Sequence, residues 1–167
     1  MIVQVVEQDF KEFIAQDDKE TTSNDDITLV VLESKPENIL EKKFSNYLSL
    51  LEKVETEIID FLQKYSIQLM EIRLGLHEML ANAVEHGNQL KEDKQVHVEV
   101  AVTEEYTRLV IEDEGVGFNW EEKLTASLQD TGFQDRGRGI MITKELFDKV
   151  QYNKKGNKIC LIKFREE

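Results

Sequence analysis

Glu78 and Asn82 lie four residues apart, so a helix at this point places both side chains on one face. A carboxylate and a carboxamide in this arrangement can share one hard cation and one water molecule. Asparagine offers a carbonyl oxygen to Mg²⁺, and a nearby glutamate can accept the proton of an attacking hydroxyl. Such pairs also occur on ordinary solvated helix faces, so the spacing alone leaves both interpretations open.

Asp113 ends a segment of alternating apolar residues and is followed by Gly115 and Gly117. In a strand, Asp113 shares its face with Leu109 and Ile111, which points its carboxylate toward the apolar side. A buried carboxylate needs hydrogen-bond donors, and an exocyclic amine such as that of adenine is one. The two glycines allow the backbone to approach a flat ring or to turn through positive φ. A β-turn closed by an aspartate side-chain hydrogen bond is the alternative.

Arg136, Gly137, Arg138 and Gly139 directly precede a predicted helix that begins near Ile140. The free N–H groups and positive dipole end of a helix N-terminus attract phosphate, and arginines add charge-assisted hydrogen bonds to phosphate oxygens. A plain glycine-rich connection accounts for the same residues. The Gly-x₄-Gly-Lys-Ser/Thr pattern of phosphate-binding loops does not occur in the chain.

The spacing of apolar residues predicts the elements that must position these side chains. A period of 3.6 predicts helices over about residues 47–62, 66–86 and 140–149. A period of two and short apolar runs predict strands over residues 39–44, 96–102, 107–113, 150–153 and 158–164. Because helices precede most of the strands, we expect an α+β fold, with a mixed sheet and helices packed on one face.

Composition narrows the class of protein. The 167 residues include 34 acidic and 21 basic side chains, a net charge of −13, with a single proline and a single cysteine, Cys160. An acidic chain without a basic cluster repels phosphodiester backbones, so we expect no nucleic-acid partner. No apolar run approaches the roughly 20 residues that cross a bilayer, and a lone cysteine agrees with a reducing cytoplasm. We therefore expect a cytoplasmic protein with no membrane span.

The three motifs, in this order, resemble the N, G1 and G2 boxes of the GHKL ATPase superfamily, which includes gyrase, heat-shock chaperones, mismatch-repair proteins and histidine kinases. The sequences of residues 78–87 and 136–148 are most similar to those of bacterial anti-sigma-factor serine/threonine kinases. The resemblance covers about residues 37–167. It implies a Bergerat-type α/β sandwich that binds ATP and Mg²⁺, with a mobile lid over residues 120–135.

In this family the matching residues have assigned roles. The resemblance implies that Glu78 is the general base, that Asn82 binds Mg²⁺ and that Asp113 binds the adenine amine. Gly115 and Gly117 would adjoin the nucleotide, as would Arg136, Gly137, Arg138 and Gly139. Relatives transfer the γ-phosphate to a serine of a small anti-sigma-factor antagonist. One departure is that Asn157 follows Gly156, where relatives often carry a threonine or serine whose hydroxyl supports the adenine contact through water.

Two other functions compete with the kinase interpretation. One is an anti-sigma factor that acts mainly by sequestering a sigma factor, with phosphorylation as its release switch. The other is a nucleotide-binding regulatory module without transfer activity, against which the presence of both Glu78 and Asn82 argues. A histidine kinase needs a phosphoacceptor histidine on an upstream helix, whereas His77 and His86 lie within the predicted helix of the first motif and His97 lies in a strand.

Residues 1–34 have a separate character. They are rich in acidic side chains, and residues 24–32 resemble the closing strand of bacterial metal-dependent serine/threonine phosphatases. We expect residues 1–34 to be the C-terminal remnant of a phosphatase-like domain and residues 35–167 to form the kinase domain, with Pro36 at the boundary. The apolar run of residues 27–32 offers a strand edge that can pair with a second copy, so we expect this segment to favour homodimers.

Overall fold

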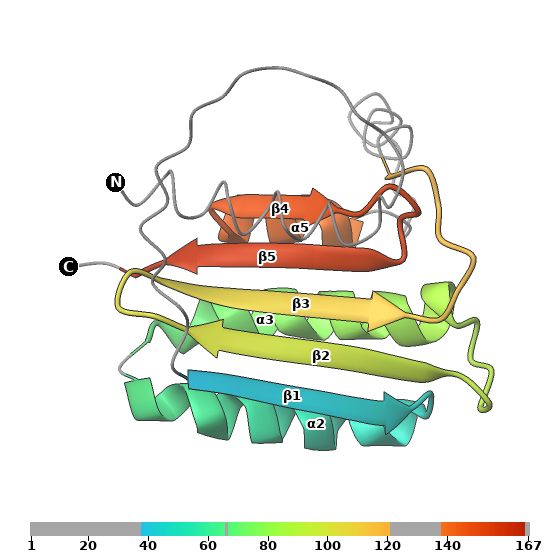
Figure 1. Ribbon diagram of the computed structural model, residues 1–167, viewed down its shortest axis with the longest axis horizontal. Helices are drawn as coiled ribbons and strands as arrows, with labels where there is room; N and C mark the ends of the chain where they lie inside the picture. Colours follow the sequence, from blue (N-terminus) through green and yellow to red (C-terminus); the bar gives the residue numbers. More distant parts are fainter. Residues whose placement is uncertain (1–37, 66, 121–137, 166–167) are drawn as a thin grey trace, which may run out of the picture.

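Five strands form one sheet in the order β1-β2-β3-β5-β4 in the computed structural model, which describes residues 38–65, 67–120 and 138–165 (Figure 1). The strands are β1 (Asn38–Ser45), β2 (Gln95–Val102), β3 (Tyr106–Asp113), β4 (Lys149–Tyr152) and β5 (Lys158–Phe164). Both bounds of each predicted strand agree with those of the observed strand to within one residue.

The pairing of the strands corrects one expectation. All four pairings between the described strands are antiparallel, whereas the order of the predicted elements favoured a mixed sheet. Two helices lie between β1 and β2 in the chain, and the second helix returns the chain to the end at which β1 stopped. Short turns join β2 to β3 and β4 to β5, and such connections require antiparallel neighbours.

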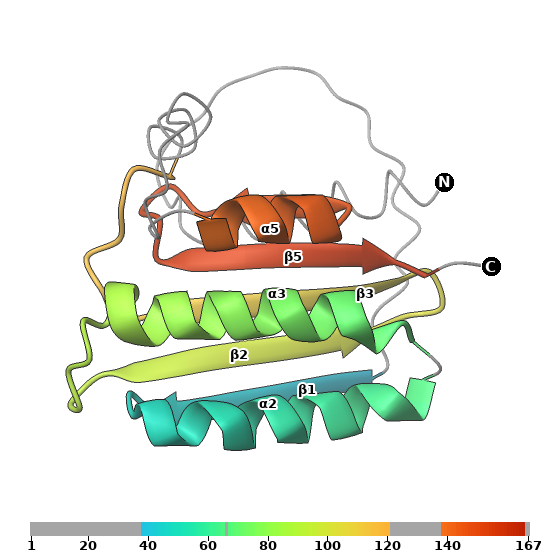
Figure 2. The ribbon, with the colours of Figure 1, turned by 180° about the vertical axis from the view of Figure 1, so that it is seen from behind.

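Three α-helices of the described residues cover one face of the sheet: α2 (Leu48–Leu62), α3 (Leu69–Ala81) and α5 (Arg138–Leu146) (Figure 2). In Figure 2, α3 lies between the other two helices and in front of the central strands. This arrangement confirms the predicted α+β class with helices on one face. In the part of the chain that the structure describes, no helix is long and apolar enough to cross a membrane.

The core lies between the sheet and the helices. The period of two in β2 turns Val96, Val98, Val100 and Val102 toward the helices, and each of them is almost fully buried. Burying a side chain of this size contributes roughly 1.5–3 kcal/mol. The alternation predicted from the sequence therefore sets which face of the sheet packs and also fixes the direction in which the residues at the strand ends point.

The second predicted helix differs from the observed one in its last turn. The sequence predicted one helix over residues 66–86, but α3 ends at Ala81 and is followed by a π-helical turn, η2 (Asn82–Gly87). The remnant at residues 1–34, its boundary at Pro36 and the lid beyond Trp120 lie outside the described residues and stay predictions.

Gly75 of α3 packs closely against Phe147, which follows α5, and this contact can be tested by mutation. A Cβ added at Gly75 would overlap the buried ring of Phe147. Alanine favours a helix over glycine by about 1 kcal/mol, but overpacking a core costs about 1–3 kcal/mol. We expect Gly75→Ala to lower the free energy of unfolding by about 1 kcal/mol, measured by denaturant titration. Adding Phe147→Leu should restore part of the loss, and a Gly75→Ala protein more stable than the wild type would contradict this packing.

Candidate functional site

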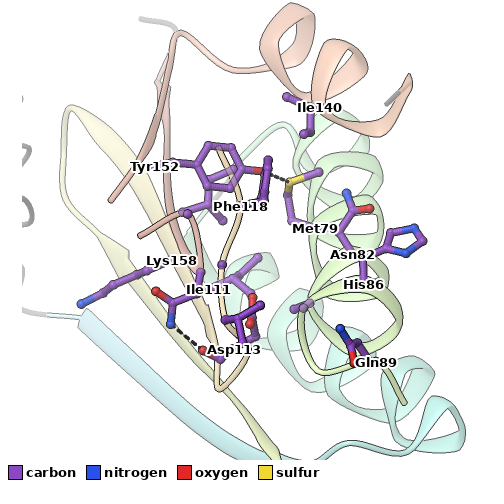
Figure 3. A pocket seen from close by; sticks show the side chains of 17 residues that line it. Met79, Asn82, His86, Gln89, Ile111, Asp113, Phe118, Ile140, Tyr152 and Lys158 are labelled. Carbon is purple, nitrogen blue, oxygen red and sulfur yellow. Dashed lines mark hydrogen bonds between the residues drawn. The ribbon is translucent and has the colours of Figure 1, made fainter. Parts of the chain in front are cut away.

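A pocket of about 200 Å³ lies between the C-terminal end of the α3–η2 helix and the ends of β3 and β5 (Figure 3). Asn82 and His86 belong to the helical side, and Asp113, Phe118 and Tyr152 come from the side of the sheet. The other apolar side chains of the lining include Met79, Ala83, Ile111, Ile140 and Ile159. The pocket thus combines apolar walls with a few polar groups, as is typical of a site for a small organic ligand.

The helix that carries Glu78 and Asn82 changes its winding at the pocket. At the end of η2, the N–H of Asn88 donates to the carbonyl of Ala83, five residues earlier, at 2.8 Å. Single π-helical turns within α-helices are frequent at functional sites, because the extra residue in the turn alters which side chains share a face. Here Asn82, Ala83 and His86 all line the pocket.

Asn88 fixes the end of this helix against the strands. Its fully buried carboxamide donates to Asn46 Oδ1 at 3.2 Å and to the carbonyl of Gln95 at 2.9 Å, and it accepts from the N–H of Glu114 at 2.9 Å. Asn46 in turn donates to the carbonyl of Val84 at 3.2 Å. This buried polar network holds η2 in register with the segment that follows Asp113.

Gly139 brings the first turn of α5 against Glu78 and Asn82. A Cβ added at Gly139 would lie 2.6 Å from Glu78 Oε2 and 3.3 Å from Asn82 Nδ2. The two head groups are therefore neighbours, and glycine is the residue that leaves room for both. The structure thus brings together Glu78, Asn82 and Gly139 from the first and third motifs. Arg136 and Gly137 lie outside the described residues, and of Arg138 only the backbone is described, at the start of α5.

Asp113 lies at the end of β3 with 9% of its surface exposed. Its Oδ1 accepts a hydrogen bond from the N–H of Gly115 at 2.7 Å. Gly87 packs directly on the carboxylate, since a Cβ there would lie 2.6 Å from Oδ1, and a Cβ on Gly115 would overlap the carbonyl of Gly87. Glycines at these two positions let the η2 backbone and the strand end enclose the carboxylate.

Gly117 and Gly156 allow the segment after Asp113 to pack closely against the β4–β5 turn. Both have positive φ, +76° and +78°, and a Cβ on either residue would overlap a carbonyl of the opposing segment. Those carbonyls belong to Lys155 and Phe118. The glycines therefore serve a close approach of two backbones that also form part of the pocket wall.

Burial dominates the electrostatics of the pocket. It raises the pKa of Asp113, and the Gly115 N–H and the positive charges of Lys155 and Lys94 offset this effect only in part. Burial and the nearby charge of Asp113 also raise the pKa of the Tyr152 hydroxyl well above its ordinary value. The ionised Asp113 carboxylate is thus poorly stabilised by its surroundings, which suits it to accept a hydrogen bond from a ligand.

Aromatic side chains at the β4 end were not predicted as site residues. Tyr152 contacts Phe118 edge-on at 5.3 Å between ring centroids, stacks on Trp120 at 5.9 Å, and donates its hydroxyl to Met79 Sδ at 3.6 Å. The apolar pattern identified Tyr152 only as part of a strand. Its place at the pocket follows from the long-range pairing of β4 with β5, for which the sequence offers no local signal.

Asn157 was noted from the sequence only as a departure from the threonine or serine of relatives, and it was not predicted as a site residue. It lines the pocket, is 6% exposed and hydrogen-bonds to Asp113. His77 is exposed on α3 and lies 2.7 Å from Glu55 Oε1 of α2.

Comparison with known proteins identifies the family. The family model described as the histidine kinase-like ATPase domain matches residues 44–163, which is more than half of the chain. The chain belongs to this family. Curated relatives of this histidine kinase-like ATPase domain include the anti-sigma F factors of Clostridium perfringens strains SM101 and 13. They are 26% and 27% identical over 101 residues, which cover 58% of this chain and 72% of each relative.

Membership of the histidine kinase-like ATPase family implies that the chain binds ATP. It confirms the GHKL resemblance recognised in the three motifs. The matched residues include every described element except most of β1 and the last residue of β5, so the family match spans the pocket as well as the core.

The contact of Gly139 with Glu78 predicts a separation of stability from activity. Alanine suits the first turn of α5 better than glycine, and its Cβ would displace only the flexible end of Glu78. We expect Gly139→Ala to keep or raise the melting temperature while turnover of the γ-phosphate of labelled ATP falls by about 10–100-fold. Lys144→Ala, an exposed change in the same helix, is the control. Unchanged turnover in Gly139→Ala would show that the placement of Glu78 does not matter.

Burial of Asp113 predicts opposite effects on stability and binding. The pKa of Asp113 in the folded protein lies above the ordinary 3.8. As pH rises from 3.8 through the folded-state pKa, ionisation of Asp113 therefore lowers the free energy of unfolding. We expect Asp113→Asn, which can still accept the Gly115 hydrogen bond, to gain stability over the wild type as pH rises from below 4 to neutrality. ADP binding should weaken by about 1.5–3 kcal/mol. Thermal unfolding against pH and calorimetry measure the two effects, and equal ADP affinities would exclude an adenine contact at Asp113.

Proposed function

We propose that this chain is an ATP- and Mg²⁺-dependent protein serine/threonine kinase that phosphorylates an anti-sigma-factor antagonist. The observation that carries the proposal is the packing of Gly139 against Glu78 and Asn82, beside a pocket that contains the buried Asp113. An oxygen ligand for a cation, Asn82, and a base-binding carboxylate, Asp113, then line one cavity, and a proton acceptor, Glu78, lies beside Asn82. Family membership and the similarity to anti-sigma F factors support the same function.

The pocket suits a purine base. Met79, Ile111 and Phe118 supply apolar surface for the faces of a ring, and Asp113 offers a carboxylate at the depth at which the edge of the ring would lie. The exocyclic amine of adenine can donate to this carboxylate and compensate part of its desolvation. In this proposal the adenine lies in the described pocket and the phosphates extend toward Asn82 and the start of α5.

The residues present fit a magnesium ion. Asn82 is half-buried at the pocket, with the Glu78 carboxylate beside it. Among the residues that the structure describes, no group of three or more His, Cys, Asp or Glu side chains could hold a metal ion. Mg²⁺ needs no such cluster, because it is commonly held by one or two protein oxygens together with waters and nucleotide phosphates. A Mg²⁺ ion held there would supply positive charge to neutralise the charge that develops on the phosphate oxygens.

Glu78 is the proposed general base. The serine oxygen of the substrate protein forms a bond to the γ-phosphorus as the bond from that phosphorus to ADP breaks, and the serine proton passes to the Glu78 carboxylate. In this proposal the phosphates lie at the N-terminal turn of α5, which contains Arg138 and Gly139, where free N–H groups and the positive end of the helix dipole would bind them. Arg136 and Gly137 remain sequence predictions for the same phosphate contacts.

A second candidate function is supported by the names of the relatives. Anti-sigma F factors are named for action on a sigma factor, so sequestration of a sigma factor is the alternative to catalysis as the main activity. Incubation with labelled ATP and candidate antagonist proteins tests the kinase activity. A pull-down with candidate sigma factors in the same samples tests sequestration, and stable sigma binding without any phosphotransfer would favour the second function.

The proposed division of roles predicts different outcomes for the two polar residues of α3 and η2. Glu78→Gln should keep the affinity for ADP within a few-fold while phosphotransfer falls by about 10²–10⁴, because it removes only the proton acceptor. Asn82→Ala should weaken both Mg²⁺-dependent nucleotide binding and transfer. Calorimetry and transfer from labelled ATP measure the two quantities.

Glu85→Gln serves as the matched control, because Glu85 is an exposed carboxylate of the same helical segment and does not line the pocket. It should leave binding and transfer unchanged. Normal transfer by Glu78→Gln would remove Glu78 from the mechanism, whatever the behaviour of Asn82→Ala.

A further inference from the structure

Asn157 stands where the pairing of β3 with β5 ends. The ladder of the two strands runs to Glu112 opposite Lys158, and the N–H of Asp113 then donates to the carbonyl of Asn157 at 2.9 Å. The carbonyl of Asp113 accepts from the side chain of Asn157 instead, with Nδ2 donating at 2.7 Å. Both backbone polar groups of Asp113 are therefore bonded to this one asparagine.

The carboxamide of Asn157 is itself held in one orientation. Its Oδ1 accepts from Asn153 Nδ2 at 3.0 Å, which leaves Nδ2 as the atom that faces Asp113. Asn153 Oδ1 accepts from the N–H groups of Gly156, Asn157 and Lys158 at 2.8–3.2 Å. Asn153 and Asn157 are both buried, so an amide turned the wrong way would leave polar atoms without partners.

The side chain of Asp113 has little freedom once its backbone is fixed. Gly87 and Gly115 enclose the carboxylate, and the Gly115 N–H binds Oδ1. A rotation of the Asp113 peptide would therefore move the carboxylate directly, and Asn157 is the residue that restrains this peptide from the β5 side.

We propose that Asn157 is a positioning residue that, by restraining both backbone polar groups of Asp113, makes the pocket select 6-amino over 6-oxo purines. The proposal rests on the proposed function, since it presupposes a nucleotide in this pocket. A 6-oxo group presents an acceptor to the fixed carboxylate and leaves both groups unpaired, and sites built to hydrogen-bond an amine reject analogues without it. A carboxylate free to turn away would lose this discrimination.

The test is calorimetric titration of the full 167-residue chain with ADP and with IDP, which differs from ADP by a 6-oxo in place of the 6-amino group. We expect the wild type to bind ADP at least about tenfold more tightly. Asn157→Asp keeps the shape of the side chain but cannot donate to the Asp113 carbonyl. It should reduce the ratio of ADP to IDP affinity by about tenfold, mainly through a loss of ADP affinity.

A second variant tests the same contact with less risk to the fold. Asn153→Asp keeps an acceptor for the three N–H groups of the turn but cannot donate to Asn157 Oδ1. If the Asn157 carboxamide turns over, its Nδ2 can donate to the new carboxylate. Its Oδ1 then faces the Asp113 carbonyl, and the hydrogen bond to that carbonyl is lost. This variant should also lower the ratio of affinities. Thr103→Ala is the control, because Thr103 is a buried hydrogen-bonding residue at the opposite end of β3.

The outcomes separate this inference from the proposed function. Binding of neither nucleotide by the wild type would overturn both. A wild type that prefers ADP, with the preference unchanged in folded Asn157→Asp and Asn153→Asp, would overturn the role of Asn157 alone. An equal fall of the ratio in Thr103→Ala would assign the effect to lost stability and would likewise overturn it.

Discussion

The buried carboxylate of Asp113 is the constraint on which the rest of the pocket depends. A charge at this depth is costly, and its raised pKa reflects that cost. The fold keeps it there by enclosing it between backbones, which requires glycine at positions 87 and 115 and a side-chain donor, Asn157, at the end of the strand ladder. Stability is lost at this position in exchange for a hydrogen-bond acceptor aimed into an apolar cavity, which is the arrangement expected of a recognition site.

The helical side of the pocket is held in place relative to Asp113. Asn88 ties the end of η2 to β2 and to Glu114, so the helix cannot shift without disturbing the residue next to Asp113. Gly139 then allows α5 to approach Glu78 and Asn82 closely. The three motifs, far apart in the chain, meet because buried hydrogen bonds and glycine contacts bring together a strand end, a helix end and a helix start.

Local patterns predicted much of the fold. Apolar alternation located β2 and β3, helical spacing located α2, and the order of the motifs indicated the family that the comparison confirms. The π-helical turn at Asn82 was not predicted, because one extra residue per turn leaves almost no trace in an apolar pattern. The antiparallel pairing of all the described strands was missed because the directions of β1 against β2 and of β3 against β5 depend on long connections, although short turns join the other two pairs.

The candidate site was predicted in part for the same reason. Asp113 was expected at the end of a strand from its neighbours Leu109 and Ile111, and it lies there, buried. Tyr152 could not be found in this way, and Asn157 was noted only as a departure from the residue that relatives carry. Their places at the pocket depend on the register of β5 against β3 and β4, and the sequence carries no local sign of that register.

The most direct measurement is a fluorescence titration of the unmodified chain with ADP and with GDP in the presence of Mg²⁺. Trp120, the only tryptophan, stacks on Tyr152, which lines the pocket, so a base that enters beside Tyr152 should alter its emission. A buried carboxylate that recognises the adenine amine predicts a saturable change with ADP and none with GDP at the same concentrations. An equal response to both nucleotides, or no response to ADP, would contradict the account.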